Sequence, residues 1–289
     1  MTNTLLILGD SLVDAGNTAS VCSQLGLDNL YQDPIYAGGG NVKTSDGLVL
    51  GELVALQMGG KVDDAQLISI LSTESPRGVQ VHNYAHAFAR TDFSPMLSEQ
   101  MGIGVKQQLN SLVQRAAYYK SNPDVDVILA CGGNDMYAVF SQIEEINKVI
   151  STKTKEDNKK FAVDIAKSIT RNIRKTISQL DDIVDEIAVA GITPMMELPD
   201  SQDWLTNFQG EDRTRASKLI SKIGKKITRK LHISFESNPD VHVNNGYELF
   251  GQIESPSFVD GFHPDSETSL QMAKLFVNEM TENLDTFGF

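Results

Sequence analysis

The sequence contains few cysteines and no long hydrophobic run, and each absence argues against a class of protein. Its 289 residues include two cysteines, Cys22 and Cys131, which lie far apart and belong to no Cys-x-x-Cys or Cys/His pattern. We therefore expect free, buried thiols, no disulfide framework, no metal site and no other cofactor. The apolar run Leu5 to Leu8 stops at Gly9-Asp10, and no run approaches the ~18 residues of a membrane span, so we expect no integral membrane association.

Positive charge is also scarce. The chain has 25 Lys and Arg against 38 Asp and Glu, a net charge of −13, which disfavours nucleic acid as a partner. The segment from Arg213 to Lys230 differs, because it has eight basic residues, no acidic ones and an apolar stripe of helical period. Peripheral contact with a lipid surface or an anionic substrate is one interpretation. The stripe favours the other, a helix that packs on a sheet and exposes a solvated lysine face.

The beginning of the chain lacks the pattern of a leader. Met1-Thr2-Asn3 has no basic residue, and the apolar stretch that follows is too short for a secretory h-region. We expect no signal peptide in the given sequence, and either a cytoplasmic protein or a secreted one whose leader has been removed. Nothing in the pattern favours one oligomeric state.

Short apolar runs alternate with longer segments of helical period in a chain that is 40% apolar and 22% charged. This alternation is typical of a parallel sheet covered by helices on both faces. No Pro/Gly/Ser-rich linker divides it, so we expect one domain over residues 1–289, with the chemistry just after the strands. The candidate strands are Leu5–Leu8, Val79–Val81, Val125–Cys131, Ile192–Leu198 and Val241–Val243.

The clearest helical stripe runs from Phe161 to Val184 at spacings of three and four residues, with Gly191 as its expected C-cap. The glycine cluster Gly38-Gly39-Gly40 is expected to be a loop. Further helices are expected over Leu48–Met58, Gln107–Tyr119, Met136–Ile146, Leu219–Leu231 and Leu270–Met280.

Three polar motifs follow the sheet pattern. Ser11 comes directly after the first strand, where its hydroxyl would be exposed at the carboxyl edge. Gly132-Gly133-Asn134-Asp135 follows the third strand and opens a helix, whose backbone donors and Asn134 amide favour a developing negative charge. Asp260 precedes His263 by three residues, close enough for the carboxylate to hold the imidazole in one tautomer. Each motif alone is common in turns, but their joint placement predicts a serine nucleophile with an acid and a base.

The sequence resembles the SGNH (GDSL) hydrolases over nearly the whole chain, and within them the phospholipase/lecithinase/hemolysin-like branch of GDSL esterases. The resemblance implies a flavodoxin-like three-layer α/β/α sandwich with a central parallel sheet of about five strands. It also implies hydrolysis of a small-molecule or lipid carboxylic ester through an acyl-enzyme. Five ordered blocks carry it: Gly9 to Asn17, Asn83-Tyr84-Ala85 with Ala89-Arg90-Thr91, Gly132 to Asp135, Leu198-Pro199-Asp200, and Asp260 to Pro264.

The same resemblance implies a role for individual residues. Ser11 would be the nucleophile, His263 the general base and later acid, and Asp260 the group that orients His263. The oxyanion would be bound by the backbone N–H of Ser11, the side chain of Asn134 and the backbone N–H of Phe88, without a metal or cofactor.

One block departs from the family pattern. Where relatives have Gly-Gly, this chain has Ala87-Phe88. If that position requires a positive φ, a phenylalanine there is strained by about 1–3 kcal/mol, and its ring would narrow the acyl or leaving-group pocket. In the alternative, the loop shifts and Phe88 merely packs. His86, Trp204 and Phe262 are further pocket candidates, although an inert loop histidine is the favoured interpretation of His86 and loop aromatics often only anchor the loop.

Two further functions stay open. An acyltransferase would pass the same acyl group to an alcohol, and a catalytically impaired binding protein would keep only the fold. Ala87-Phe88 suggests the latter, whereas the presence of both Asp260 and His263 argues against it.

Overall fold

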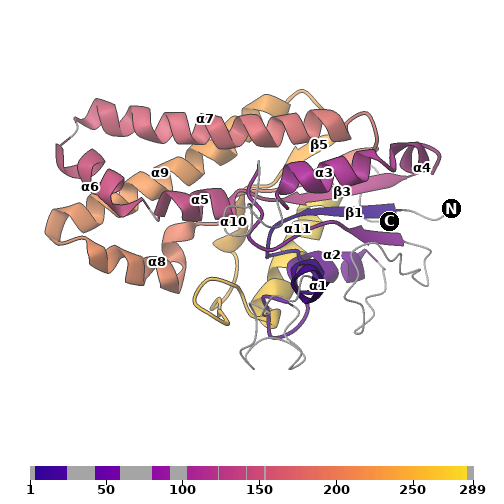
Figure 1. Cartoon of the computed structure of the whole chain (residues 1–289), viewed down its shortest axis with the longest axis horizontal. Helices are drawn as coiled ribbons and strands as arrows, with labels where there is room; N and C mark the ends of the chain where they lie inside the picture. Colours follow the sequence, from indigo (N-terminus) through magenta and orange to yellow (C-terminus); the bar gives the residue numbers. More distant parts are fainter. Residues whose placement is uncertain are drawn as a thin grey trace.

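The computed structural model describes residues 4–24, 43–58, 80–91, 103–122, 124–140, 142–152 and 154–284. These residues form one parallel sheet with the strand order β2-β1-β3-β4-β5, which confirms the predicted central sheet (Figure 1). The predicted loop Gly38-Gly39-Gly40 lies outside them. The strands are β1 (Thr4–Gly9), β2 (Gln80–Asn83), β3 (Val125–Ala130), β4 (Glu186–Ala190) and β5 (Val241–Val243).

The strand order creates a switch point beside β1. From β1 the chain first adds β2 on one side and then β3, β4 and β5 on the other. Connections that leave in opposite directions open a crevice at the carboxyl ends of the strands, where ligands bind in open α/β sheets. The residues that follow β1 and β3 therefore meet at this crevice.

Helices cover both faces of the sheet, as Figure 1 shows, and the alternation of side chains along β1 explains why. Leu6 and Leu8 pack in one core cluster and Leu5 and Ile7 in the other, so β1 must be apolar at every position. The first cluster is covered by α3 (Val105–Val113), α5 (Gly133–Phe140), α6 (Ile143–Thr152), α7 (Lys155–Leu180) and α9 (Gly210–Phe235). The second is covered by α2 (Leu50–Gln57) and α11 (Ser266–Asn283).

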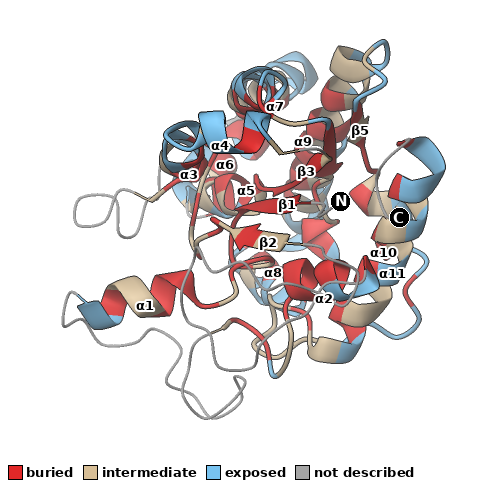
Figure 2. Cartoon of the chain, turned by 90° about the vertical axis from the view of Figure 1, so that its right-hand side faces the viewer, coloured by how far each residue is buried: buried red, intermediate tan, exposed pale blue. Residues whose placement is uncertain are grey.

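Burial follows these layers. Figure 2 shows the strands and the inner faces of the helices buried, with the exposed residues on the outer faces. Cys22 and Cys131 are free and buried, as predicted. None of the described helices is both long enough and apolar enough to cross a membrane. The remaining helices are short: α1 (Asn17–Gln24), α4 (Ala116–Lys120), α8 (Pro199–Trp204) and α10 (Gly246–Phe250).

The predicted fourth strand, Ile192–Leu198, is wrong. The strand is Glu186–Ala190, and the later segment forms a loop with a 3₁₀ turn over Met195–Glu197. Pro194 lacks the N–H that a central strand needs for its ladder. The helix before it ends at Leu180, so Gly191 is not its C-cap.

Two other predicted helices are interrupted. The segment after Asn134 forms α5 and α6, and Gln107–Tyr119 divides into α3 and α4 around Arg115, whose φ of −108° and ψ of 10° leave the helical range. Periodicity gave the buried faces of these segments but not their breaks.

Gly191 has a different structural role. A Cβ atom there would lie 2.2 Å from the carbonyl oxygen of Asn244 and 2.8 Å from the nitrogen of Gly246. We expect Gly191→Ala to lower the free energy of unfolding by about 1–3 kcal/mol, because the ends of β4 and β5 would be forced apart. Urea unfolding measures this. Gly251→Ala is the control, since its nearest atom is 3.3 Å away, and equal stability of the two variants would contradict the prediction.

Candidate active site

Ser11 lies at the carboxyl end of β1, where the backbone is held on several sides. Gly9 has a φ of 155°, and a Cβ atom there would lie 2.1 Å from the Ala130 carbonyl oxygen. The side chain of Gln108 binds both backbone groups of Gly9, accepting from its N–H at 2.9 Å and donating to its oxygen at 2.8 Å. Ser11 is 4% exposed. Gln108 therefore fixes the strand end two residues before the serine.

Gln108 was missed by the sequence analysis, although a signal was present. It falls with Val105, Leu109 and Leu112 on the buried stripe of α3. A glutamine on an otherwise apolar stripe must find buried hydrogen-bond partners, and here they are the backbone groups of Gly9.

His263 connects the serine to a carboxylate. Its Nε2 lies 2.9 Å from Oγ of Ser11, and its Nδ1 lies 2.6 Å from Oδ2 of Asp260. The other oxygen of Asp260 accepts from the backbone N–H groups of Phe262 at 3.0 Å and His263 at 2.7 Å. With the Nδ1 proton directed at Asp260, the Nε2 lone pair faces the hydroxyl. A hydroxyl, an imidazole and a carboxylate in this order form the arrangement found in serine hydrolases.

The segment Leu198-Pro199-Asp200 supports this turn. Gly261 has a φ of 79°, and a Cβ atom there would lie 2.4 Å from Oδ1 of Asp200. The N–H of Asp200 donates to the Gly261 oxygen at 3.0 Å. Partial burial, together with the nearby charge of Asp260, raises the pKa of Asp200. This explains why an aspartate next to α8 belongs with the acid–base turn.

The loop between β2 and α3 carries Phe88 with a φ of 63°, so the left-handed conformation is present at this phenylalanine. The N–H of Ala87 donates to Asp14 and to Thr18, each at 2.8 Å. On the other side, Nδ2 of Asn134 donates to the Ala89 oxygen at 3.2 Å. The residues predicted to bind an oxyanion in this loop and at the start of α5 therefore share one hydrogen-bonded unit.

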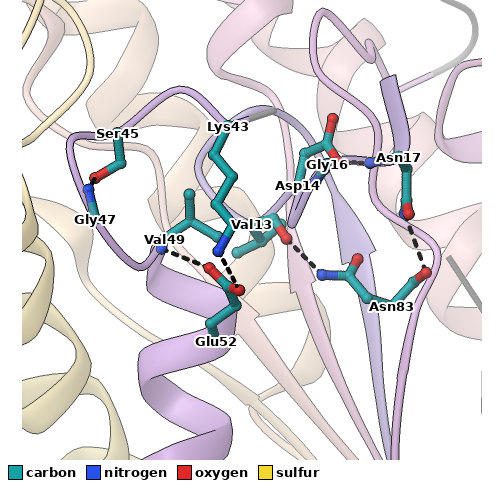
Figure 3. Close-up of polar contacts among 10 residues, drawn as sticks. All are labelled: Val13, Asp14, Gly16, Asn17, Lys43, Ser45, Gly47, Val49, Glu52 and Asn83. Carbon is teal, nitrogen blue, oxygen red and sulfur yellow. Dashed lines mark hydrogen bonds and ion pairs between the residues drawn. The ribbon is translucent and has the colours of Figure 1, made fainter. Parts of the chain in front are cut away.

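Asp14 joins the loop after Ser11 to the loop that carries Phe88. Its carboxylate accepts from the N–H groups of Gly16 at 2.9 Å, Asn17 at 2.7 Å and Thr18 at 3.2 Å, in addition to that of Ala87. Figure 3 shows the surroundings, where Asn17 donates to the Asn83 oxygen and Asn83 donates to the Val13 oxygen. Four N–H donors satisfy this buried carboxylate without a basic side chain.

The segment before α2 closes the other side of the loop. Lys43 forms an ion pair of 2.7 Å with Glu52, which also accepts from the Val49 N–H at 3.0 Å (Figure 3). Thr44 donates to the Ser11 oxygen at 2.6 Å. Burial raises the pKa of Glu52, and Lys43 opposes that shift.

The pocket candidates occupy different positions. Phe262 contacts His263, with ring centroids 5.2 Å apart, whereas Trp204 stacks on Phe140 at 4.9 Å and donates from Nε1 to the Phe140 oxygen at 2.9 Å. Tyr137, which the sequence analysis missed, is 49% exposed and bridges Phe140 to Phe262. The aromatic rings thus form a continuous series from Trp204 to His263.

His86 is enclosed by the loop, and its Nδ1 has no hydrogen-bond partner among the described residues. Burial lowers the pKa of His86, against the opposing charge of Asp14. In the part of the chain that the structure describes, no three His, Cys, Asp or Glu side chains are grouped as a metal site.

The comparisons with known proteins agree with this architecture. Residues 5–276 match the family model described as GDSL-like Lipase/Acylhydrolase, and the chain therefore belongs to this family of ester hydrolases, as the resemblance predicted. The narrower branch stays a prediction. No curated protein sequence matches the chain.

Solved structures share the fold at low sequence identity. The lipase Lip_vut3 from a goat rumen metagenome is 14% identical, with a TM-score of 0.53 and coverage of 99% of this chain and 100% of that one. An extracellular lipase from Streptomyces rimosus is 12% identical, with a TM-score of 0.48 and coverage of 96% and 99%. The acetylxylan esterase Axe2 from Geobacillus stearothermophilus is 14% identical, with a TM-score of 0.45 and coverage of 96% and 94%.

The backbone at Phe88 gives a stability prediction. Alanine retains the unfavourable left-handed conformation, whereas glycine adopts it readily, and both variants lack the ring. We expect Phe88→Gly to be more stable than Phe88→Ala by about 1 kcal/mol. Urea unfolding of the two variants measures the difference, and a more stable alanine variant would show that the loop has a different conformation.

Asp10 gives a pH prediction. Burial, with a smaller contribution from Asp135, raises its pKa from 3.8 to about 7, and the Leu12 N–H opposes the shift. The folded protein then binds a proton that the unfolded chain releases near pH 4, so this group makes stability fall as the pH rises from about 4 to 7. We expect Asp10→Asn, which resembles the protonated acid, to remove roughly 3–4 kcal/mol of that fall.

The measurement is the free energy of unfolding at several pH values between 4 and 8. Asp164→Asn, at an exposed position on α7, is the control. Parallel pH curves for wild type and Asp10→Asn would contradict the prediction.

Proposed function

We propose that the protein hydrolyses carboxylic esters through an acyl-enzyme, within a single domain, with Ser11 as nucleophile, His263 as base and Asp260 as its orienter. One observation carries the proposal. The Oγ of Ser11 lies 2.9 Å from Nε2 of His263, whose Nδ1 lies 2.6 Å from Asp260, although the serine and histidine are 252 residues apart.

In the first half of the reaction, Oγ of Ser11 attacks the ester carbonyl carbon while its proton passes to Nε2 of His263. The tetrahedral intermediate collapses, the bond to the alcohol breaks, and the alcohol leaves with the proton from Nε2. In the second half, water gives a proton to Nε2 and attacks the acyl carbon, and the proton returns to Ser11 as the acid leaves. Asp260 stabilises the imidazolium at both stages.

The negative oxygen of each intermediate would be bound by the N–H of Ser11, the N–H of Phe88 and Nδ2 of Asn134. Each such donor contributes about 3–4 kcal/mol in the transition state. The hydrogen bonds of Ala87 and Asn134 support this role, because they hold the donor loop on both sides of Phe88. Fixed donors need no reorganisation during the reaction.

The substrate would be an ester of a small molecule or a lipid. The rings of Phe88 and Phe262 would narrow the space beside the reacting carbonyl. We therefore favour short or slender acyl groups, with His86 behind the loop and Trp204 supporting Phe262 through Tyr137.

We expect Ser11→Ala to lower the turnover of short p-nitrophenyl esters by roughly 10³-fold or more, because no other hydroxyl accepts the acyl group. Initial rates across a range of acyl lengths measure this. Ser168→Ala, at an exposed serine of α7, is the matched control and should retain the wild-type rate.

The result also separates the alternatives. Equal turnover by wild type and Ser11→Ala would overturn the proposal, and failure of a fluorophosphonate probe to label Ser11 would favour a binding protein on this fold. Ester products formed with added glycerol would identify an acyltransferase that uses the same acyl-enzyme.

A further inference from the structure

The charge of this acidic chain is distributed unevenly. Helices α7 and α9 pack side by side on one face of the sheet (Figure 1). They carry seven and eight Lys and Arg against three and two Asp and Glu, so the pair has a net charge of +10 in a chain of −13. Within the described residues, Arg215 is the one basic residue of this pair that forms an ion pair. The surface of these helices therefore attracts anions.

A groove between α9 and α10 lies on this basic surface. It has a volume of about 490 Å³ and does not include Ser11, Asp260 or His263. Its polar lining comes from three successive turns of α9 and from the start of α10. The side chains that the argument uses are Lys225, Thr228, Arg229, His232, Tyr247 and Glu248. We call this the α9–α10 groove.

One buried hydroxyl in the α9–α10 groove lacks a partner. Thr228 is 5% exposed, and its Oγ1 has no hydrogen-bond partner among the described residues. A buried hydroxyl without a partner is costly, so its presence on the groove wall points to a ligand that supplies one. Lys225 and Arg229, both exposed, flank it on the same helix.

The opposite wall is rigid. Tyr247 donates to the Ser221 oxygen at 3.3 Å, and a Cβ atom at Gly224 would lie 2.5 Å from its hydroxyl oxygen. The Lys225 Nζ lies 5.4 Å from the centre of its ring. This close approach fixes the width of the groove and keeps the ammonium group at its mouth.

We propose that the α9–α10 groove binds a phosphate group attached to a hydroxylated alcohol, as in glycerol phosphate. Lys225 and Arg229 neutralise the phosphate, and the Thr228 hydroxyl donates to one of its oxygens. Glu248, on the other side of the groove, accepts from a hydroxyl of the alcohol. A phosphate without such an alcohol would leave Glu248 facing only negative charge.

Two sources contain this chemistry, a soluble phosphate ester and the headgroup of phosphatidylglycerol. Ile233 also lines the groove and is 60% exposed, so it is placed to enter the apolar part of a lipid layer. The proposal is independent of ester hydrolysis, and its test uses no ester substrate.

The test is calorimetric titration of the full chain with glycerol 3-phosphate at low ionic strength. We expect Arg229→Gln to weaken binding about tenfold or more, as for other charged hydrogen bonds. Thr228→Val should also weaken it while leaving the unliganded protein equally or more stable, because it replaces an unpartnered hydroxyl with a methyl group. Arg213→Gln, an exposed arginine of α9 outside the groove, is the matched control.

Absence of binding, or equal weakening by Arg213→Gln and Arg229→Gln, would overturn the proposal. The source is decided by flotation with vesicles of phosphatidylcholine alone or with phosphatidylglycerol. Flotation that requires phosphatidylglycerol and is lost in Arg229→Gln identifies the lipid headgroup. Titration with glycerol 3-phosphate without flotation identifies a soluble ester. An unchanged rate on p-nitrophenyl esters in these variants separates this site from Ser11.

Discussion

The geometry of the candidate site depends on how the peptide of Gly9 is held. On one side the Ala130 carbonyl of β3 leaves no room for a side chain, and on the other the amide of Gln108 binds both the N–H and the oxygen of Gly9. The N–H of His86 donates to the same oxygen at 3.2 Å. Three segments that are distant in sequence therefore converge on one residue, two positions before Ser11. The serine takes its position from this convergence.

The second constraint is the buried carboxylate of Asp14. An ionised group without a basic partner is costly in a protein interior unless hydrogen bonds replace its hydration. Asp14 meets this requirement with backbone donors from the loop after Ser11 and from Ala87. Because the two loops share one carboxylate, neither can move without leaving part of it unsatisfied. This couples the position of the nucleophile to that of the predicted oxyanion donors.

The sequence predicted those parts of the structure that depend on local pattern. The runs at Leu5–Leu8, Val125–Cys131 and Val241–Val243 contain observed strands, and the motifs around Ser11 and His263 follow from the rule that chemistry lies at the carboxyl edge. The error at β4 arose because Ile187 and Val189 extend the apolar pattern of the preceding helix. The contacts of Gln108, Asp14 and Tyr137 could not be predicted, since each depends on which distant segments become neighbours.

Phe88 shows why a motif can change while its geometry persists. The hydrogen bonds on either side of it, from Ala87 to Asp14 and Thr18 and from Asn134 to Ala89, are made by backbone atoms of the loop. They impose a φ of 63° whether the residue has a side chain or not. The direction of its N–H is thus set by neighbours, whereas the strain and the bulk come from the ring. Oxyanion binding and pocket size are consequently separable properties of this position, and the loss of glycine alters the second without abolishing the first.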